Sequence, residues 1–186
     1  GFGGLFASAG HGQWGRKMQD DITDGAKALA SMGWADPGRT CIVGWSYGGY
    51  AALAGGALTP EMYRCVASVA GVSHLREMLV EERRQYGPRS QTVAWWERLI
   101  GDPDTHAAAI DAVSPALIAD RFKAPVLLIH GAADTVVPIR QSELMHDALR
   151  KAQKDVRYVR IDGDDHGLVE NASRRQALTA LGAFLK

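Results

Sequence analysis

Residues 44–50, with the letters GWSYGGY, constrain the fold more than any other part of this 186-residue chain. They follow the apolar run 41–43 and precede a run of small residues at 51–54. This order predicts a strand, a sharp turn and a helix, which is the setting of the G-x-S-x-G nucleophile elbow. We expect the turn to be too tight for a Cβ atom at Gly44 or Gly48, and the serine between them to be held with its hydroxyl exposed.

Two later segments supply the partners that a reactive serine needs. A serine hydroxyl is a poor nucleophile until a base removes its proton, and that base needs a third group to fix its tautomer. Asp134 follows the apolar run 125–130, and His166 follows the alternating run 156–161. The order serine, acid, histidine, with the partners just beyond strands, is that of α/β-type serine hydrolases. We therefore predict Ser46 as nucleophile, His166 as general base and then acid, and Asp134 as the orienting carboxylate.

The residue after the serine is the expected source of one oxyanion donor. The backbone N–H of Tyr47 lies at the predicted helix start, where it points to the place of a developing oxyanion. The helix N-terminus adds positive potential there. Each triad residue alone could be a turn, cap or loop residue, but their common order and placement favour the catalytic interpretation.

These motifs together resemble the catalytic domain of the prolyl oligopeptidase family of serine peptidases. The residues that carry the resemblance are 44–50, 128–131, 134–138 and the pair Asp165-His166, with further likeness at 12–15, 20–21, 63–73 and Ser114-Pro115. The resemblance covers nearly the whole chain and is greatest to the dipeptidyl-peptidase and acylaminoacyl-peptidase branches. It implies hydrolysis of short peptides at an amide bond through an acyl-enzyme.

The resemblance also implies where the substrate lies and what else the protein contains. By position, Val136, Val137, Leu75 and Met78 would line an apolar pocket for the side chain before the cut bond. The dipeptidyl-peptidase branch has an asparagine where Val136 stands, so a wider apolar preference is expected here. The family further implies an N-terminal β-propeller and a second oxyanion donor, a tyrosine side chain upstream of this chain.

The strand pattern indicates an α/β fold with a mostly parallel sheet flanked by helices. The four convincing strands are at 40–44, 65–70, 125–130 and 156–161. A complete α/β-hydrolase domain has roughly eight strands, mostly parallel. We therefore expect residues 1–186 to be a partial catalytic domain, the C-terminal part of the fold with its first strands missing.

The remaining segments are assigned by periodicity and by turn residues. Helices are expected at 20–32, 139–152 and 170–184, and the glycine-rich residues 1–19 are expected to form a loop. The charged stretch 73–100 contains Trp95 and Trp96, and it either borders the active site or forms a plain pair of surface helices.

Composition excludes several other classes of protein. The chain has 21 basic and 21 acidic residues, so its formal net charge of zero does not favour binding to nucleic acid or to an anionic membrane surface. No apolar run approaches the ~20 residues of a membrane span. No cofactor signature is present. The acidic residues around His166 could suggest a metal, but their spacing is not that of an EF-hand and a triad histidine explains His166 better.

Three questions remain open at the level of sequence. Cys41 and Cys65 are expected on neighbouring strands as small apolar groups, with a disulfide as the alternative. Elbow and triad chemistry also fits a carboxylesterase of the same fold, or an inactive fragment that serves as a binding module. Neither the two cysteines nor the first residues indicate a cellular compartment.

Overall fold

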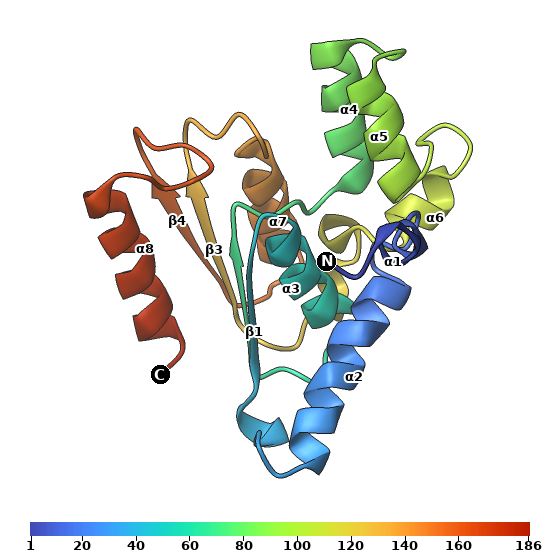
Figure 1. Ribbon diagram of the computed structural model, residues 1–186. Helices are drawn as coiled ribbons and strands as arrows, with labels where there is room; N and C mark the ends of the chain where they lie inside the picture. The colour runs from blue at the N-terminus through green and yellow to red at the C-terminus, as the bar shows by residue number, and fades with distance from the viewer.

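The computed structural model describes all residues, Gly1–Lys186, and is built on one parallel sheet (Figure 1). The strands are β1 (Cys41–Trp45), β2 (Cys65–Val69), β3 (Val126–Gly131) and β4 (Val156–Ile161). They lie in the order β1-β2-β3-β4, and every neighbouring pair is parallel. All four predicted strands are thus present, with bounds that differ by no more than one residue. The carboxyl ends of parallel strands meet at one edge, where loops can gather side chains.

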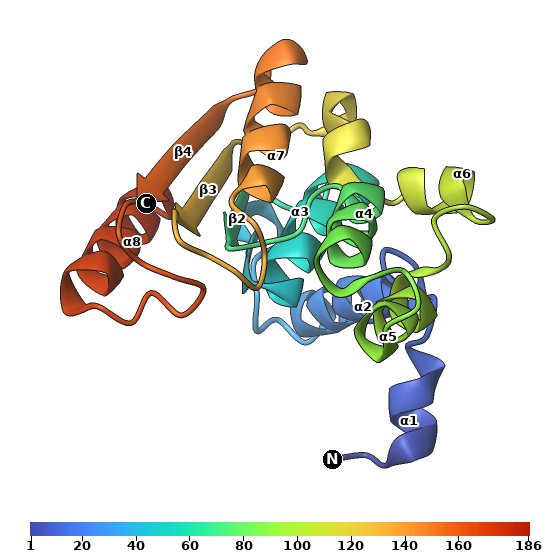
Figure 2. The ribbon, with the colours of Figure 1, turned by 90° about the horizontal axis from the view of Figure 1, so that it is seen from above.

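Helices cover both faces of the sheet (Figures 1 and 2). Their bounds are α1 (Gly4–Ala9), α2 (Lys17–Ser31), α3 (Tyr47–Leu58), α4 (Leu75–Tyr86), α5 (Gln91–Ile100), α6 (Ala107–Asp111), α7 (Arg140–Lys151) and α8 (Asn171–Phe184). Helices α3 and α7 pack on one face and α8 on the other, while α2 packs on α3 from outside. None of these helices combines the length and apolar character needed to cross a membrane.

The two central strands are buried on both faces, which explains their continuous apolar sequence. Every residue of β2 and β3 is buried. On one side Leu53, Val66 and Leu128 pack together, and on the other Leu127 and Ile129 lie against α8. Each such side chain contributes about 1.5–3 kcal/mol by leaving water, so the centre of the sheet is the most strongly held part of the molecule.

Small residues allow α3 to lie unusually close to the sheet. A Cβ atom at Gly49 would be 2.7 Å from the Cα atom of Gly71, just beyond β2, and at Gly56 it would be 2.7 Å from the Phe122 ring. Real side chains do not tolerate such contacts, so glycine is required at both positions. The close approach brings the first turn of α3 directly over the end of β1.

The N-terminal region differs from the expected loop. Residues 4–9 form α1, and α2 begins at Lys17, three residues before the predicted start. Helix α1 buries none of its residues, and the side chain of Leu5 is 91% exposed. Because α1 buries no face, its residues need no apolar periodicity, and that periodicity is the pattern from which a helix is predicted. The backbone N–H of Ala7 still donates to the carbonyl of Gly3 and closes a turn.

The two cysteines form a disulfide, so the prediction that they pack as separate apolar groups was wrong. Cys41 and Cys65 are directly paired in the register of β1 and β2, with their Cα atoms 4.7 Å apart. Adjacent strands were predicted, but the register was not. A shift of one residue would have placed the two sulfur atoms on opposite faces of the sheet.

Helices α4 and α5 form a hairpin that projects beyond the carboxyl edge of the sheet (Figure 1). The Arg83 guanidinium of α4 holds the hairpin together, since its Nη2 lies 2.6 Å from Glu97 Oε1 and its Nη1 lies 2.7 Å from Asp104 Oδ2. The backbone N–H of Val93 donates to Ser90 Oγ at the start of α5. This hairpin is the predicted charged stretch, and it carries the tryptophan pair.

Candidate active site

The turn between β1 and α3 has the strained geometry of a nucleophile elbow. Ser46 has φ 57° and ψ −120°, a left-handed backbone conformation that is rare for a residue with a side chain. A Cβ atom at Gly44 would overlap the backbone carbonyl of Gly48. At Gly48 itself a Cβ would meet nothing within 4 Å, so the expectation of a steric requirement there was wrong. The backbone of Gly48 lies so close to Gly44 that only a residue without a Cβ atom fits at position 44.

Helix α3 begins immediately after the serine, at Tyr47. The first four N–H groups of an α-helix lack an intrahelical partner, so the Tyr47 N–H is free to donate to a ligand. The phenol of the same residue packs inward, and burial together with the charge of Asp21 raises the pKa of Tyr47 to about 12. Its ring is therefore a neutral wall near the serine.

Asp134 and His166 are brought together from loops that follow β3 and β4. Asp134 Oδ2 lies 2.7 Å from His166 Nδ1, although the two residues are 32 positions apart in sequence. The other oxygen, Asp134 Oδ1, accepts the backbone N–H groups of Val136 at 2.8 Å and Val137 at 2.9 Å. Both oxygens of the carboxylate are thus engaged, and its plane is fixed relative to the imidazole ring.

The Asp134 carboxylate stays ionised despite its burial. Burial alone acts to raise its pKa, but hydrogen bonds from His130, His166 and the backbone N–H groups of Val137 and Val136 outweigh this effect. The pKa of Asp134 is therefore held below its ordinary value. An ionised carboxylate on Nδ1 favours the imidazole tautomer that leaves Nε2 unprotonated and able to accept a proton.

The His166 loop is fastened at two further points. Trp45 Nε1 donates to the His166 carbonyl at 3.0 Å, which ties the loop to the strand before the elbow. Asp164 accepts the backbone N–H groups of Asp165, Val169 and Glu170 at 2.8, 3.1 and 3.2 Å. Asp164 therefore holds both sides of the loop and the start of α8. The sequence suggested Asp164 only as one of the acidic residues that could bind a metal, because no local pattern marks a carboxylate that binds the backbone of its own loop.

Ser46 and His166 lie at the same edge of the sheet without a hydrogen bond between them. The Ser46 side chain is half-buried, and the His166 side chain is 22% exposed. Nucleophile–base hydrogen bonds are often long without substrate and tighten when it binds. Two of the three predicted residues are thus in direct contact, and the third stands on a turn anchored to the same loop through its neighbour Trp45.

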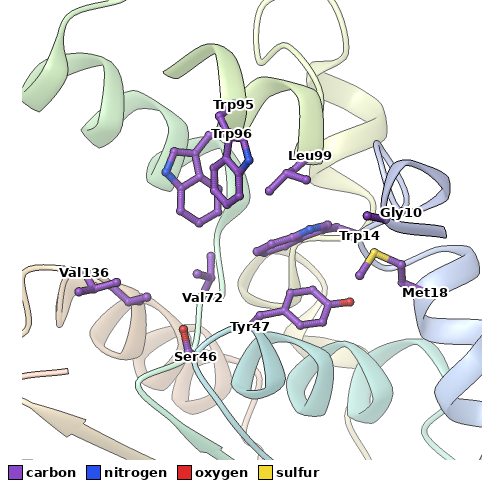
Figure 3. A pocket seen from close by; sticks show the side chains of 12 residues that line it. Gly10, Trp14, Met18, Ser46, Tyr47, Val72, Trp95, Trp96, Leu99 and Val136 are labelled. Atoms are coloured by element: carbon purple, nitrogen blue, oxygen red, sulfur yellow. The ribbon is translucent and has the colours of Figure 1, made fainter. Parts of the chain in front are cut away.

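A pocket of about 380 Å³ opens beside Ser46 (Figure 3). Tyr47, Trp14, Trp96 and Leu99 of α5 gather on one side of the pocket, and Val136 lies across from Leu99 on the side of Ser46. Ten of the twelve lining residues are hydrophobic, which suits an apolar group. A serine at the edge of a mostly apolar cavity is the usual arrangement of a specificity pocket next to a nucleophile.

The structure places the four predicted pocket residues in two groups. Val136 and Val137 line the pocket, and the Val136 side chain is 52% exposed. Leu75 and Met78 do not reach it, because both are fully buried in the core with Tyr50. They lie on the face of α4 that packs against the core, so neither side chain lines the pocket.

In place of Leu75 and Met78, the pocket is lined by aromatic residues that were not predicted to belong to it. The ring centroids of Trp14 and Tyr47 are 4.7 Å apart, and those of Trp14 and Trp96 are 6.1 Å apart in an edge-on arrangement. Pairs of this kind contribute about 0.5–1.5 kcal/mol each beyond simple burial. Their signals in the sequence were the family-like segment 12–15, which contains Trp14, and the tryptophan pair within a charged stretch.

Comparisons with known proteins identify the family. The sequence profile of the prolyl oligopeptidase family matches residues 1–186, so the chain belongs to that family. The chain is 32% identical to dipeptidyl aminopeptidase BIII of Pseudoxanthomonas mexicana over 183 residues, which are 96% of this chain and 26% of that protein. It is 33% identical to dipeptidyl peptidase family member 6 of Caenorhabditis elegans over 170 residues, which are 90% of this chain and 23% of that protein.

Solved structures show the same relationship. A puromycin-hydrolyzing peptidase of Mycobacterium tuberculosis matches 96% of this chain and 26% of its own with a TM-score of 0.86 and 31% identity. An acylaminoacyl peptidase of Pyrococcus horikoshii matches the fold over 100% of this chain and 29% of its own, with a TM-score of 0.83 and 24% identity. The chain forms part of an α/β-hydrolase domain and spans about a quarter of the length of the relatives it matches.

Proposed function

We propose that the protein is a serine peptidase that cleaves short peptides through Ser46, His166 and Asp134. The observation that carries the proposal is the 2.7 Å hydrogen bond between Asp134 and His166, at the sheet edge that also holds the strained Ser46 turn. Membership in the prolyl oligopeptidase family supports the same activity. Residues 1–186 would be part of the catalytic domain of the whole protein.

The reaction follows from the roles of these groups. Ser46 Oγ attacks the carbonyl carbon of the peptide bond while its proton passes to His166 Nε2. The negative charge that develops on the carbonyl oxygen is stabilised by the Tyr47 N–H. His166 then gives its proton to the leaving amine as the carbon–nitrogen bond breaks, which leaves an acyl group on Ser46. A water molecule, deprotonated by His166, attacks this ester, and the proton returns to Ser46 as the acid product leaves.

The pocket beside Ser46 supports an apolar preference at the residue before the cut bond. Its volume of about 380 Å³ and its walls of Trp14 and Trp96 suit a large aliphatic or aromatic side chain. Val136 adds an apolar group at the mouth of the pocket. We expect peptide p-nitroanilides with Phe or Leu before the cut to have a higher kcat/KM than those with Ala or Pro. A clear preference for Pro would contradict this assignment.

Other parts of the whole protein would complete the site. We propose that a tyrosine upstream of these residues supplies the second oxyanion donor and that an N-terminal β-propeller restricts access to short peptides. The resemblance to the family is the support for both parts. Removing one oxyanion donor typically costs about 2.7–4 kcal/mol of transition-state stabilisation, so this chain alone should be a poor catalyst.

A fluorophosphonate probe tests the proposed function directly. Such probes react covalently with activated serines, and peptide mapping by mass spectrometry locates the adduct. We expect stoichiometric labelling of the whole protein at Ser46 and none in a Ser46→Ala variant, which should also lose peptide hydrolysis. Labelling at another residue, or undiminished turnover by Ser46→Ala, would contradict the proposal. Hydrolysis of short acyl esters without cleavage of any peptide amide would favour a carboxylesterase instead.

A further inference from the structure

A second histidine, His130, lies against the same carboxylate and has no part in the reaction described above. It occupies β3, and its side chain is fully buried, as is that of Asp134. His130 Nε2 lies 2.8 Å from the Val137 carbonyl and 3.2 Å from Asp134 Oδ2. On the other side of the ring, Nδ1 lies 2.7 Å from Ser142 Oγ of α7.

These partners assign the proton on the His130 ring. A backbone carbonyl can only accept a hydrogen bond, so the nitrogen that faces Val137 must carry the proton. Nδ1 then accepts from the Ser142 hydroxyl. The same Nε2–H faces the Asp134 carboxylate, which also only accepts. Neutral His130 therefore satisfies all its neighbours with one proton, on Nε2.

His130 faces Asp134 Oδ2, the same carboxylate oxygen that accepts the hydrogen bond from His166. Asp134 Oδ2 accepts from His166 Nδ1 at 2.7 Å and also faces His130 Nε2 at 3.2 Å. Without His130, rotation of the carboxylate would be opposed on this side by His166 alone, which stands on a partly exposed loop. His130, by contrast, stands on a buried central strand, and its side chain is fully buried.

His130 also holds the turn that carries the pocket wall. It binds the Val137 carbonyl, while the Val137 N–H donates to Asp134 Oδ1 at 2.9 Å. One peptide segment is thus held at both its donor and its acceptor, by the histidine and by the carboxylate. The Val137 side chain reaches the pocket beside Ser46. Loss of the His130 donor would loosen the carboxylate and this turn together.

We propose that His130 is a positioning residue, whose Nε2–H holds the Asp134 carboxylate and the 134–137 turn in the orientation that His166 requires, an inference that rests on the proposed function. It does not touch substrate or exchange protons during the reaction. Its effect reaches the chemistry only through Asp134.

Two substitutions in the whole protein separate the hydrogen bond from the volume of the ring. His130→Phe keeps a ring of similar size but removes the donor, and His130→Gln places an amide N–H close to the position of Nε2. For a peptide p-nitroanilide with Phe before the cut, we expect His130→Phe to lower kcat by up to about 100-fold, the effect of slight misplacement of catalytic groups. KM should change by less than about threefold, and His130→Gln should recover most of the lost kcat.

Leu149→Ala is the matched control for stability. Leu149 is fully buried on α7, seven residues beyond Ser142, which is about 10 Å further along the helix. It should lower the melting temperature and leave kcat unchanged. If His130→Phe retains kcat within threefold of wild type, the positioning role is wrong. It is equally wrong if His130→Gln and His130→Phe lose the same activity.

A third variant keeps the test valid if His130→Phe does not fold. Ser142→Ala keeps the ring but removes the hydroxyl that holds its orientation at Nδ1, and we expect a kcat loss of about 2- to 10-fold, the value of one hydrogen bond. Unchanged kcat would then contradict the inference. Failure of the proposed function is distinguishable, because wild type itself would neither cleave these amides nor react with a fluorophosphonate at Ser46.

Discussion

At the scale of single residues, backbone groups hold the candidate triad as firmly as side chains do. Asp134 uses one oxygen for His166 and the other for the N–H groups of the following turn. The Asp164 carboxylate likewise accepts hydrogen bonds from backbone N–H groups around the His166 loop. The elbow is joined to that loop by the Trp45 indole. Motif spacing predicted the three candidate triad residues because they follow strands, but these supporting contacts depend on loop conformation.

The Trp45 contact leads to a prediction at this scale. Trp45→Phe removes the indole N–H that donates to the His166 carbonyl but keeps an aromatic ring. Because one hydrogen bond contributes about 0.5–1.5 kcal/mol, kcat should fall by about 2- to 10-fold. Steady-state kinetics of the whole protein on a peptide p-nitroanilide measures the change. Trp34→Phe, at a side chain that is 77% exposed, is the control and should behave as wild type. Equal kcat values for both variants would argue against the contact.

At the scale of elements, the α4–α5 hairpin decides the shape of the pocket. Helix α4 turns its apolar residues Leu75 and Met78 into the core, and α5 turns Trp96 and Leu99 toward Ser46. Resemblance to the family suggested, by position, that Leu75 and Met78 of α4 line the pocket. In the folded structure the two helices pack so that α5, and not α4, lines the pocket. Helical periodicity shows which residues share a face, but it does not show which face meets a cavity.

Arg83 is expected to support substrate binding by holding this hairpin. Arg83→Met keeps an apolar stem and removes the ion pairs with Glu97 and Asp104. We expect a loss of about 1 kcal/mol in stability, since the guanidinium is partly shielded and makes charge-assisted hydrogen bonds. KM for Phe-containing substrates should rise more than kcat falls. Arg84→Met is the matched control, because Arg84 is paired only with Glu81 on its own helix and is mostly exposed. An equal KM for both variants would show that Arg83 is not needed to hold the hairpin in place beside the pocket.

At the scale of the whole molecule, one parallel sheet gathers the three candidate triad residues at its carboxyl edge. The elbow follows β1, the carboxylate follows β3 and the histidine follows β4. The disulfide between Cys41 and Cys65 lies at the opposite end of the first two strands. It therefore bears on the stability of the sheet and does not touch the site.

Reduction of this disulfide should destabilise the protein without changing its chemistry. The bond closes a loop between residues 24 positions apart, for which chain entropy predicts a contribution of about 3 kcal/mol. The Cys41→Ser/Cys65→Ser double variant should thus unfold at lower denaturant concentration than wild type. Adding a reductant should lower the midpoint of wild type and leave that of the double variant unchanged. A wild-type midpoint insensitive to a reductant that removes the bond, verified by thiol counting, would contradict this expectation.

The sequence by itself predicted the four strands, the elbow and the candidate triad of Ser46, Asp134 and His166. These follow from local pattern, because apolar runs, turn residues and chain order are properties of neighbours along the chain. Tertiary structure alone decided the strand register that joins the cysteines and the second histidine that faces Asp134. It also decided which helix supplies the aromatic wall of the pocket. Such contacts join residues distant in sequence, and small shifts in packing, which no local pattern encodes, determine whether they meet.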